Sequence, residues 1–187
     1  MAKLLLVKHA RPVMQPDVPA PRWVLSDEGR ASCSGLANAL SGAGVTRVYA
    51  SLEPKALETA SLACARLGLA VHPRPGLHEN DRTGLAFAEA DVHARRFHDF
   101  FDEPARVSMG QESADAAHAR FIVAVRAAVA ESSGETLAVV AHGTVITLLV
   151  SRANGVDPYG LWESLGMPSW LTVDPKSFVW DREVRGL

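Results

Sequence analysis

Two histidines at opposite ends of the chain each follow a short apolar segment that predicts a buried strand. His9 comes directly after the apolar residues 4–7 and Lys8, and His142 comes directly after the apolar residues 137–141. Ligands of open α/β sheets bind beyond the carboxyl ends of the strands, so both imidazoles are expected to lie at one site. Because imidazole is a nucleophile when neutral, and its pKa lies near physiological pH, the pair predicts neutral-pH chemistry on an anion.

Positive charge and backbone N–H groups accompany both histidines. Lys8 and Arg11 lie beside His9, and His142-Gly143 stands at a predicted helix start, where unpaired N–H groups attract anions. A phosphoryl group in transfer needs such charges and donors around its oxygens. Imidazole can attack phosphorus and form a covalent intermediate. These residue types therefore favour phosphoryl transfer.

A leaving alkoxide needs a proton, and a carboxylic acid near the rim of the site would supply it. Glu79 follows a predicted strand and turn in the segment 76–82 and is the candidate acid. The alternatives for this role are Asp81, Glu89 and Glu112.

The elements that must position these residues alternate between strands and helices. Strands are predicted over residues 3–8, 47–50, 69–72 and 137–141. Helices are predicted from Ser26, from Pro54, around 86–101, from Ser108 to about Glu131, and through 145–150. Residues 170–174 and 178–180 are expected to form a terminal hairpin. This alternation argues for a single α/β sandwich over residues 1–187.

Three of the helix starts depend on specific local signals. Ser26 is a favourable N-cap residue and is followed by two acidic residues in the first turn. Pro54 suits the first position of a helix. Ser108, with Gln111 three residues later, fits a capping box.

The composition excludes several classes of protein. The net charge of −2 provides no basic field for nucleic acid or anionic membranes. The apolar run before Lys8 is too short for a secretory signal or a membrane span, so a cytoplasmic protein is expected. Cys33 and Cys64 are too few for a disulfide framework and are expected to be reduced core thiols.

Further histidines raise the question of a metal site: His78, His93, His98 and His118. No His-Glu-x-x-His or Cys-x-x-Cys spacing accompanies them, so neither a metal nor another cofactor is expected. A Ser/His/Asp hydrolase is also disfavoured, because the chain lacks the Gly-x-Ser-x-Gly sequence of a nucleophile elbow.

Short motifs follow one another along nearly the whole chain: Leu4–Ala10, Leu25–Gly29, Ser51–Ala60, Gly110–Ser113 and Val139–Gly143. Their order and spacing resemble those of the histidine phosphatase superfamily, also called the phosphoglycerate mutase-like fold. Lys8-His9-Ala10 stands where that family has Arg-His-Gly, and Lys55 stands where it has the arginine of Arg-Ala-x-Gln-Thr-Ala. The resemblance implies a three-layer α/β/α sandwich with a mostly parallel sheet.

The resemblance also implies a role for each residue of the site. His9 would accept the phosphoryl group, His142 would hydrogen-bond its oxygens, and Glu79 would protonate the leaving group. Lys8 and Lys55 would occupy the family's two phosphate-binding arginine positions. Water activated by the same carboxylate would then hydrolyse the phosphohistidine without a metal.

Lysine at both arginine positions is the main departure from the family pattern. Lysine brings the charge but lacks the planar fork that binds phosphate through two bonds. The chain holds 15 arginines and 4 lysines, so its composition does not explain lysine at these positions. We hypothesise that the lysines reflect a selected pocket and that Arg11 or Arg82 supplies the missing fork.

The sequence therefore predicts a metal-independent phosphomonoesterase that acts on a small phosphorylated substrate through phospho-His9. A phosphoglycerate mutase-type phosphotransferase is an alternative, although 187 residues leave little room for a lid. A weakly active or non-catalytic phospholigand-binding regulator is a further alternative, motivated by the two lysines. Neither the identity of the substrate nor the oligomeric state follows from the sequence.

Overall fold

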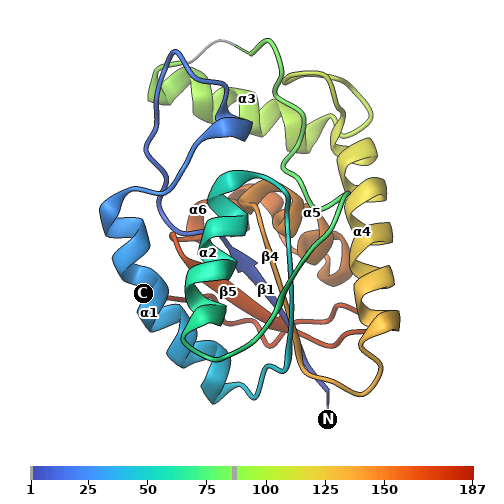
Figure 1. The fold of residues 1–187 in the computed structure, drawn as a ribbon. Helices are drawn as coiled ribbons and strands as arrows, with labels where there is room; N and C mark the ends of the chain where they lie inside the picture. Colours follow the sequence, from blue (N-terminus) through green and yellow to red (C-terminus); the bar gives the residue numbers. More distant parts are fainter. Residues whose placement is uncertain (1, 86–87) are drawn as a thin grey trace.

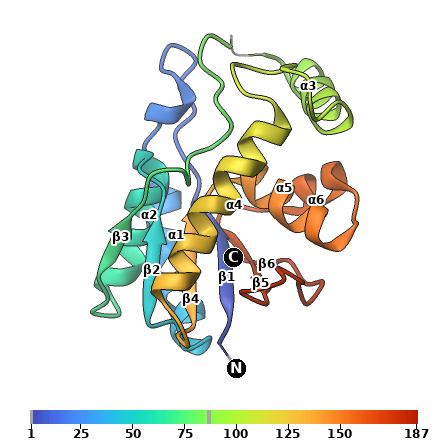
Figure 2. The same ribbon diagram turned by 90° about the vertical axis from the view of Figure 1, so that its right-hand side faces the viewer.

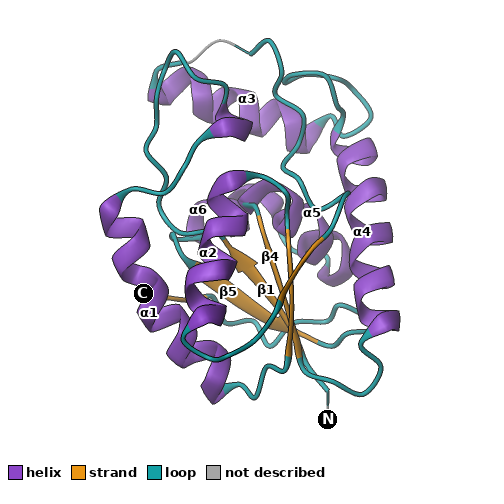
Figure 3. Ribbon diagram, viewed as in Figure 1, coloured by secondary structure: helices purple, strands orange, loops and turns teal. Residues whose placement is uncertain are grey.

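A computed structural model describes residues 2–85 and 88–187 of the chain. These residues form a mixed six-stranded sheet with helices on both faces (Figures 1 and 3). The strands are β1 (Leu4–Lys8), β2 (Arg47–Ala50), β3 (Val71–Pro73), β4 (Leu137–Ala141), β5 (Ser169–Val173) and β6 (Arg185–Gly186). The helices are α1 (Asp27–Gly42), α2 (Pro54–Ala65), α3 (Ala90–Asp102), α4 (Ala114–Glu131), α5 (Gly143–Asn154) and α6 (Pro158–Ser164), with a 3-10 helix, η1 (Ala20–Arg22).

The strand order places the two histidine-bearing strands side by side. The order across the sheet is β3-β2-β4-β1-β5-β6. Strands β1 to β4 run parallel, whereas β5 runs antiparallel to β1. Because parallel neighbours end at the same edge of a sheet, His9 after β1 and His142 after β4 leave the sheet together. The prediction of a mostly parallel sheet is confirmed.

Side chains of the central strands alternate between two apolar cores. Leu4 and Leu6 pack in the core that contains buried residues of α3, α4, α5 and α6. Leu5 and Val7 pack with α1 and α2 on the opposite face, as the two-residue period of a strand requires. Figure 1 shows α1 and α2 on one side of the sheet and α4 and α5 on the other. The predicted three-layer sandwich is confirmed.

Several elements have the bounds that their local signals predict. Ser26 caps α1, since its hydroxyl accepts a hydrogen bond from the N–H of Gly29 at 3.0 Å, and α2 begins at Pro54. Strands β2 and β4 match their predictions, whereas β3 begins two residues later than predicted, at Val71.

The predicted helix start at Ser108 is wrong. Helix α4 begins at Ala114, and its N-cap is Ser113, whose side chain accepts a hydrogen bond from the N–H of residue 116. Gly110 instead adopts a left-handed conformation with φ of 81°. The N–H of Gln111 donates to the carbonyl of Asp81 at 2.8 Å. This contact between distant segments holds residues 108–112 in a turn, so the local capping signal is overridden.

The predicted terminal hairpin is only partly correct. Strand β5 forms, but residues 178–180 make a single bridge, between Trp180 and Val173. Phe178 has a φ of 58°, which is incompatible with the extended backbone of a strand. The N–H of Asp174 donates a hydrogen bond to the carbonyl of Val179 at 2.8 Å, across the turn. The strand that pairs with β5 on the side away from β1 is β6, near the end of the chain.

The helix predicted around residues 86–101 is α3, which begins at Ala90, while residues 86–87 lie outside the described residues. Phe97 and Phe100 of this helix are fully buried in the core. Figure 2 shows α3 and the segment 10–25 beyond the carboxyl ends of the central strands. Within the described ranges, no helix is long and apolar enough to cross a bilayer.

Candidate active site

His9 lies at the end of β1 with one ring nitrogen fixed. Its backbone N–H donates to the carbonyl of Ala141 at 3.1 Å, which continues the pairing of β1 with β4. Its Nδ1 lies 2.7 Å from the carbonyl oxygen of Ala10. Because a carbonyl oxygen can only accept, Nδ1 carries the proton and Nε2 keeps a lone pair. The His9 and His142 rings lie edge to face with centroids 5.2 Å apart, so the two predicted residues are brought together.

Burial keeps both imidazoles neutral. Desolvation, with a smaller contribution from the nearby Lys55 ammonium, lowers the pKa of His9 from 6.5 to about 3. The same two causes hold the pKa of His142 well below 6.5. At physiological pH both rings are therefore unprotonated, and Nε2 of His9 is available as a nucleophile.

We expect the stability of the fold to fall as the pH drops below about 6.5, where the unfolded histidines bind protons. A folded-state pKa of about 3 for His9 means that the folded ring stays unprotonated down to pH 3. The lowered pKa therefore stabilises the fold above pH 6.5, and this contribution is lost in acid. Each such histidine should reduce the free energy of unfolding by about 1 kcal/mol between pH 7 and 5.5. Urea unfolding of wild type and His9→Gln tests this, because the variant should lose one such increment of pH dependence.

Lys8 reaches over the start of α5. Its Nζ donates to the carbonyl of Leu165 at 2.7 Å. A Cβ at Gly143 would lie 3.2 Å from Cε of Lys8, so the small residue after His142 leaves room for the lysine side chain. Burial lowers the pKa of Lys8 to about 8, although the Glu79 carboxylate partly opposes the shift. Lys8 is therefore a cation whose charge titrates near neutral pH.

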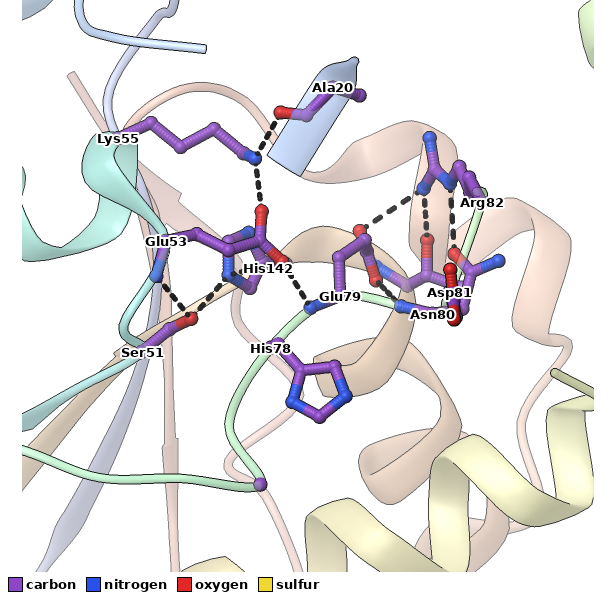
Figure 4. A network of polar contacts seen from close by, with 12 residues as sticks. Ala20, Ser51, Glu53, Lys55, His78, Glu79, Asn80, Asp81, Arg82 and His142 are labelled. Atoms are coloured by element: carbon purple, nitrogen blue, oxygen red, sulfur yellow. Dashed lines mark hydrogen bonds and ion pairs between the residues drawn. The ribbon is translucent and has the colours of Figure 1, made fainter. Parts of the chain in front are cut away.

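Lys55 lies in the first turn of α2, with a side chain only 6% exposed. Its Nζ donates to the carbonyl of Ala20 at 2.9 Å and pairs with the carboxylate of Glu53 (Figure 4). One turn later, the Thr59 hydroxyl accepts a hydrogen bond from the N–H of Ala10 at 3.0 Å. These bonds tie α2 both to the His9 segment and to η1.

Glu79 and Arg82 reach the site from the segment that follows β3. Glu79 Oε2 accepts a hydrogen bond from the N–H of Thr144 at 3.2 Å. The same oxygen lies 3.2 Å from Nη2 of Arg82 (Figure 4). Arg82 also donates to the hydroxyl of Thr144 at 3.0 Å. Its guanidinium lies over the ring of Phe97, 4.9 Å from the ring centroid. Of the two arginines predicted to supply the fork, Arg82 is the one that lines the same pocket as His9.

A half-buried arginine on α4 supports this segment. Arg120 donates to the carbonyls of Gly76, His78 and Glu79 at distances of 2.8 to 3.1 Å. It also forms two hydrogen bonds with the carboxylate of Glu112, at 3.0 and 2.8 Å. The Glu112 carboxylate is therefore paired with Arg120, whereas Glu79, in the segment after β3, lines the pocket.

Other predicted residues lie elsewhere. Arg11 has a side chain 56% exposed and pairs with Glu28 at 3.5 Å, so the structure does not bring it to the histidines. Cys33 and Cys64 are buried and free, as predicted. In the part of the chain that the structure describes, no group of three or more histidine, cysteine or acidic side chains is arranged to hold a metal ion.

The site contains residues for which the sequence analysis predicted no role. Glu53 and Ser51 follow β2 at the edge of the sheet where His142 follows β4, and Ser51 Oγ lies 2.9 Å from His142 Nε2. Both residues are polar and follow a predicted strand, which is the same signal that indicated His9 and His142. The apolar residues of the mouth come from separated segments that no local pattern connects: Pro12, Met14, Pro21, Trp23, Trp162 and Met167.

Comparison with known proteins identifies the family. The sequence model of the histidine phosphatase superfamily (branch 1) matches residues 5–181. No curated protein sequence matches the chain.

Solved structures share the fold along nearly the whole chain. The mycobacterial glucosyl-3-phosphoglycerate phosphatase Rv2419c superposes with a TM-score of 0.76 at 22% identity, covering 99% of this chain and 98% of that one. YhfR of Bacillus stearothermophilus gives 0.77 at 21% identity, with 96% and 94% covered. Phosphoserine phosphatase from Entamoeba histolytica, solved with 3-phosphoglyceric acid, gives 0.73 at 16%, with 100% and 98% covered.

The sequence match and the shared architecture agree with the motif order along the chain. The matched region includes both histidines and every residue that lines the pocket beside His9. The chain therefore belongs to the histidine phosphatase superfamily, branch 1, and is a phosphatase with the phosphoglycerate mutase-like fold.

Proposed function

We propose that the protein is a metal-independent phosphomonoesterase that acts through a phosphohistidine at His9. The observation that carries the proposal is the state of the His9 ring: it is neutral and buried, and its Nδ1 is held by the carbonyl of Ala10. Its free Nε2 belongs to a pocket that is also lined by Lys8, Lys55 and Arg82. A nucleophile surrounded by cations suits attack on an anionic phosphoryl group.

The reaction would proceed in two displacements. In the first, a bond forms between Nε2 of His9 and phosphorus, the bond from phosphorus to the leaving oxygen breaks, and Glu79 in its acid form gives that oxygen a proton. In the second, the Glu79 carboxylate takes a proton from water, whose oxygen attacks phosphorus while the bond to Nε2 breaks. Inorganic phosphate is released, and neutral His9 and the acid form of Glu79 are regenerated. Lys8, Lys55, Arg82, His142 and the N–H groups at Gly143 would bind the phosphoryl oxygens.

The mouth of the pocket favours a small substrate with an apolar, planar leaving group. Trp23 and Trp162 line the mouth, together with methionines and prolines. Trp162 is held in place by stacking on Phe97, with ring centroids 4.1 Å apart. Such surfaces bind aromatic groups better than polyhydroxylated ones, because burial of apolar area is favourable. We therefore expect aryl phosphates to be hydrolysed with a lower KM than sugar or glycerol phosphates.

A phosphomonoester panel in the presence of EDTA tests the proposal. The panel should include p-nitrophenyl, naphthyl, glycerol and glucose phosphates, and the enzyme should be quenched rapidly during turnover. We expect turnover without metal and an acid-labile, base-stable phosphate on the protein, which peptide mass spectrometry should locate at His9. Turnover that depends on added metal, or labelled phosphate at another residue, would contradict the mechanism. Binding of phosphoesters without turnover would instead support the regulator alternative.

The pKa of about 8 at Lys8 predicts an alkaline limit on phosphate binding. The Lys8 charge is present below pH 8 and is lost above it, so at pH 9 roughly one molecule in ten keeps the charge. We expect the inhibition constant of inorganic phosphate to rise about tenfold between pH 7 and 9. Lys8→Arg should remove most of this rise, because a guanidinium stays charged. Lys176→Arg, at an exposed turn, is the control and should follow wild type; an unchanged pH profile in Lys8→Arg would show that Lys8 is not the titrating group.

A further inference from the structure

Glu53 places a carboxylate inside the phosphate pocket. It is the N-cap residue of α2 and lies two residues after Ser51, at the edge of the sheet where the histidines lie. Its side chain is only 9% exposed, yet it lines the same pocket as Lys8 and His9. A buried acid at this position calls for an explanation, because burying a charge is costly unless it is paired.

The Glu53 carboxylate has three neighbours at the site. Oε2 of Glu53 forms an ion pair with Nζ of Lys55, and Oε1 accepts a hydrogen bond from the backbone N–H of Glu79 at 2.9 Å (Figure 4). Oε1 also lies 3.6 Å from Nε2 of His142. The carboxylate is therefore paired with Lys55 and lies close to His142. The proposed function assigns both of these residues to the phosphoryl oxygens.

The pocket holds less positive charge because of this acid. Among the described residues that line it, Lys8, Lys55 and Arg82 are cationic, while Glu53 and Glu79 are anionic. One positive charge is left over when both carboxylates are ionised, whereas a phosphomonoester brings two negative charges. Two anions held within a few ångströms in a partly dehydrated site repel strongly, so a bound phosphoryl group and Glu53 oppose each other.

We propose that Glu53 is an intramolecular competitor for the phosphoryl group. Resting on the proposed function, the inference is that the carboxylate occupies the Lys55 donor and approaches His142 in the free enzyme. A phosphomonoester must displace it from both. Glu53 thereby weakens the binding of substrate and of the product phosphate, so that inorganic phosphate leaves the site more readily after each turnover.

Calorimetric titration of inorganic phosphate at pH 7 tests the competition directly. Glu53→Gln keeps the size of the side chain and removes its charge, so we expect phosphate to bind at least about tenfold more tightly than to wild type. Glu103→Gln removes the same charge from an exposed pair with Arg106 and should bind phosphate as wild type does. Equal or weaker binding of phosphate by Glu53→Gln would overturn the proposal. Equal binding would mean that the carboxylate does not affect phosphate affinity, and weaker binding would mean that it positions Lys55 to bind phosphate.

The outcome also separates this inference from the proposed function. Binding of phosphate with equal affinity to wild type and Glu53→Gln, together with turnover by wild type, overturns the competition alone. A failure of all three proteins to bind phosphate overturns both.

A second measurement does not depend on the stability of any variant. In a crystal structure of wild type with vanadate in the pocket, we expect the Glu53 carboxylate to have left Nζ of Lys55 and moved away from Nε2 of His142. A complex in which vanadate binds beside His9 while the carboxylate keeps both contacts would overturn the proposal.

Discussion

Replacement of His9 by alanine should lower kcat for every phosphomonoester by a factor of about 10³ or more. The reason is that the variant loses the atom that bonds to phosphorus in the proposed mechanism, whereas the cations proposed to bind the phosphoryl group remain in place. Affinity for inorganic phosphate should therefore fall much less than kcat, and the acid-labile protein phosphate should disappear. Steady-state kinetics on an aryl phosphate and rapid-quench labelling measure the two effects.

The control for this variant is His72→Ala, at an exposed position on the edge strand β3. It should keep wild-type turnover and labelling. Substantial turnover by His9→Ala would contradict a covalent mechanism at this residue. An equal loss of phosphate affinity and kcat would point instead to a collapse of the pocket.

Replacement of Gly110 by alanine should destabilise the fold by about 2 to 5 kcal/mol. Gly110 has a φ of 81°, which costs any residue with a Cβ. The added carbon would also lie 2.0 Å from the carbonyl oxygen of Asp81 and 2.7 Å from Cα of Arg82. Both neighbours are backbone atoms, so the strain cannot be relieved by a side-chain rotation. Urea unfolding should show the midpoint shift, and activity should fall because the displaced segment carries Glu79 and Arg82.

Gly42→Ala is the matched control. Gly42 is the last residue of α1, and a Cβ there meets no atom within 4 Å. Alanine also has the higher helix propensity, so the variant should be as stable as wild type or slightly more stable. Comparable stability of Gly110→Ala and Gly42→Ala would show that residues 108–112 do not pack on the 79–82 segment as described.

The parts of the fold that follow from near neighbours in the chain could be predicted. An apolar run ending at Lys8 specifies a buried strand, and Ser26 and Pro54 begin helices because capping and a fixed φ act within one turn. The capping signal at Ser108 failed for the opposite reason. There, a hydrogen bond from Gln111 to Asp81, thirty residues away in the chain, holds the turn that replaces the first helical turn.

The candidate site shows the same division. The residue types at the strand ends, His9 and His142, led to the proposal of a nucleophile and a phosphate site, and lysine in place of arginine at two positions was visible in the sequence. The sequence did not show which of Arg11 and Arg82 supplies a guanidinium to the pocket. Only the packing of the 79–82 segment against α5 brings Arg82 to the pocket and leaves Arg11 on the surface.

The sequence by itself determined the chemistry that the chain can do, because nucleophile, cations and acid are properties of residue types placed at the ends of apolar segments. The tertiary structure decided which of these groups meet and in what state. Burial, which depends on all three layers, lowers the pKa of His9 and Lys8. The pairing of β2 with β4 brings Glu53 to His142. These interactions join residues far apart in the chain, and no local pattern encodes them.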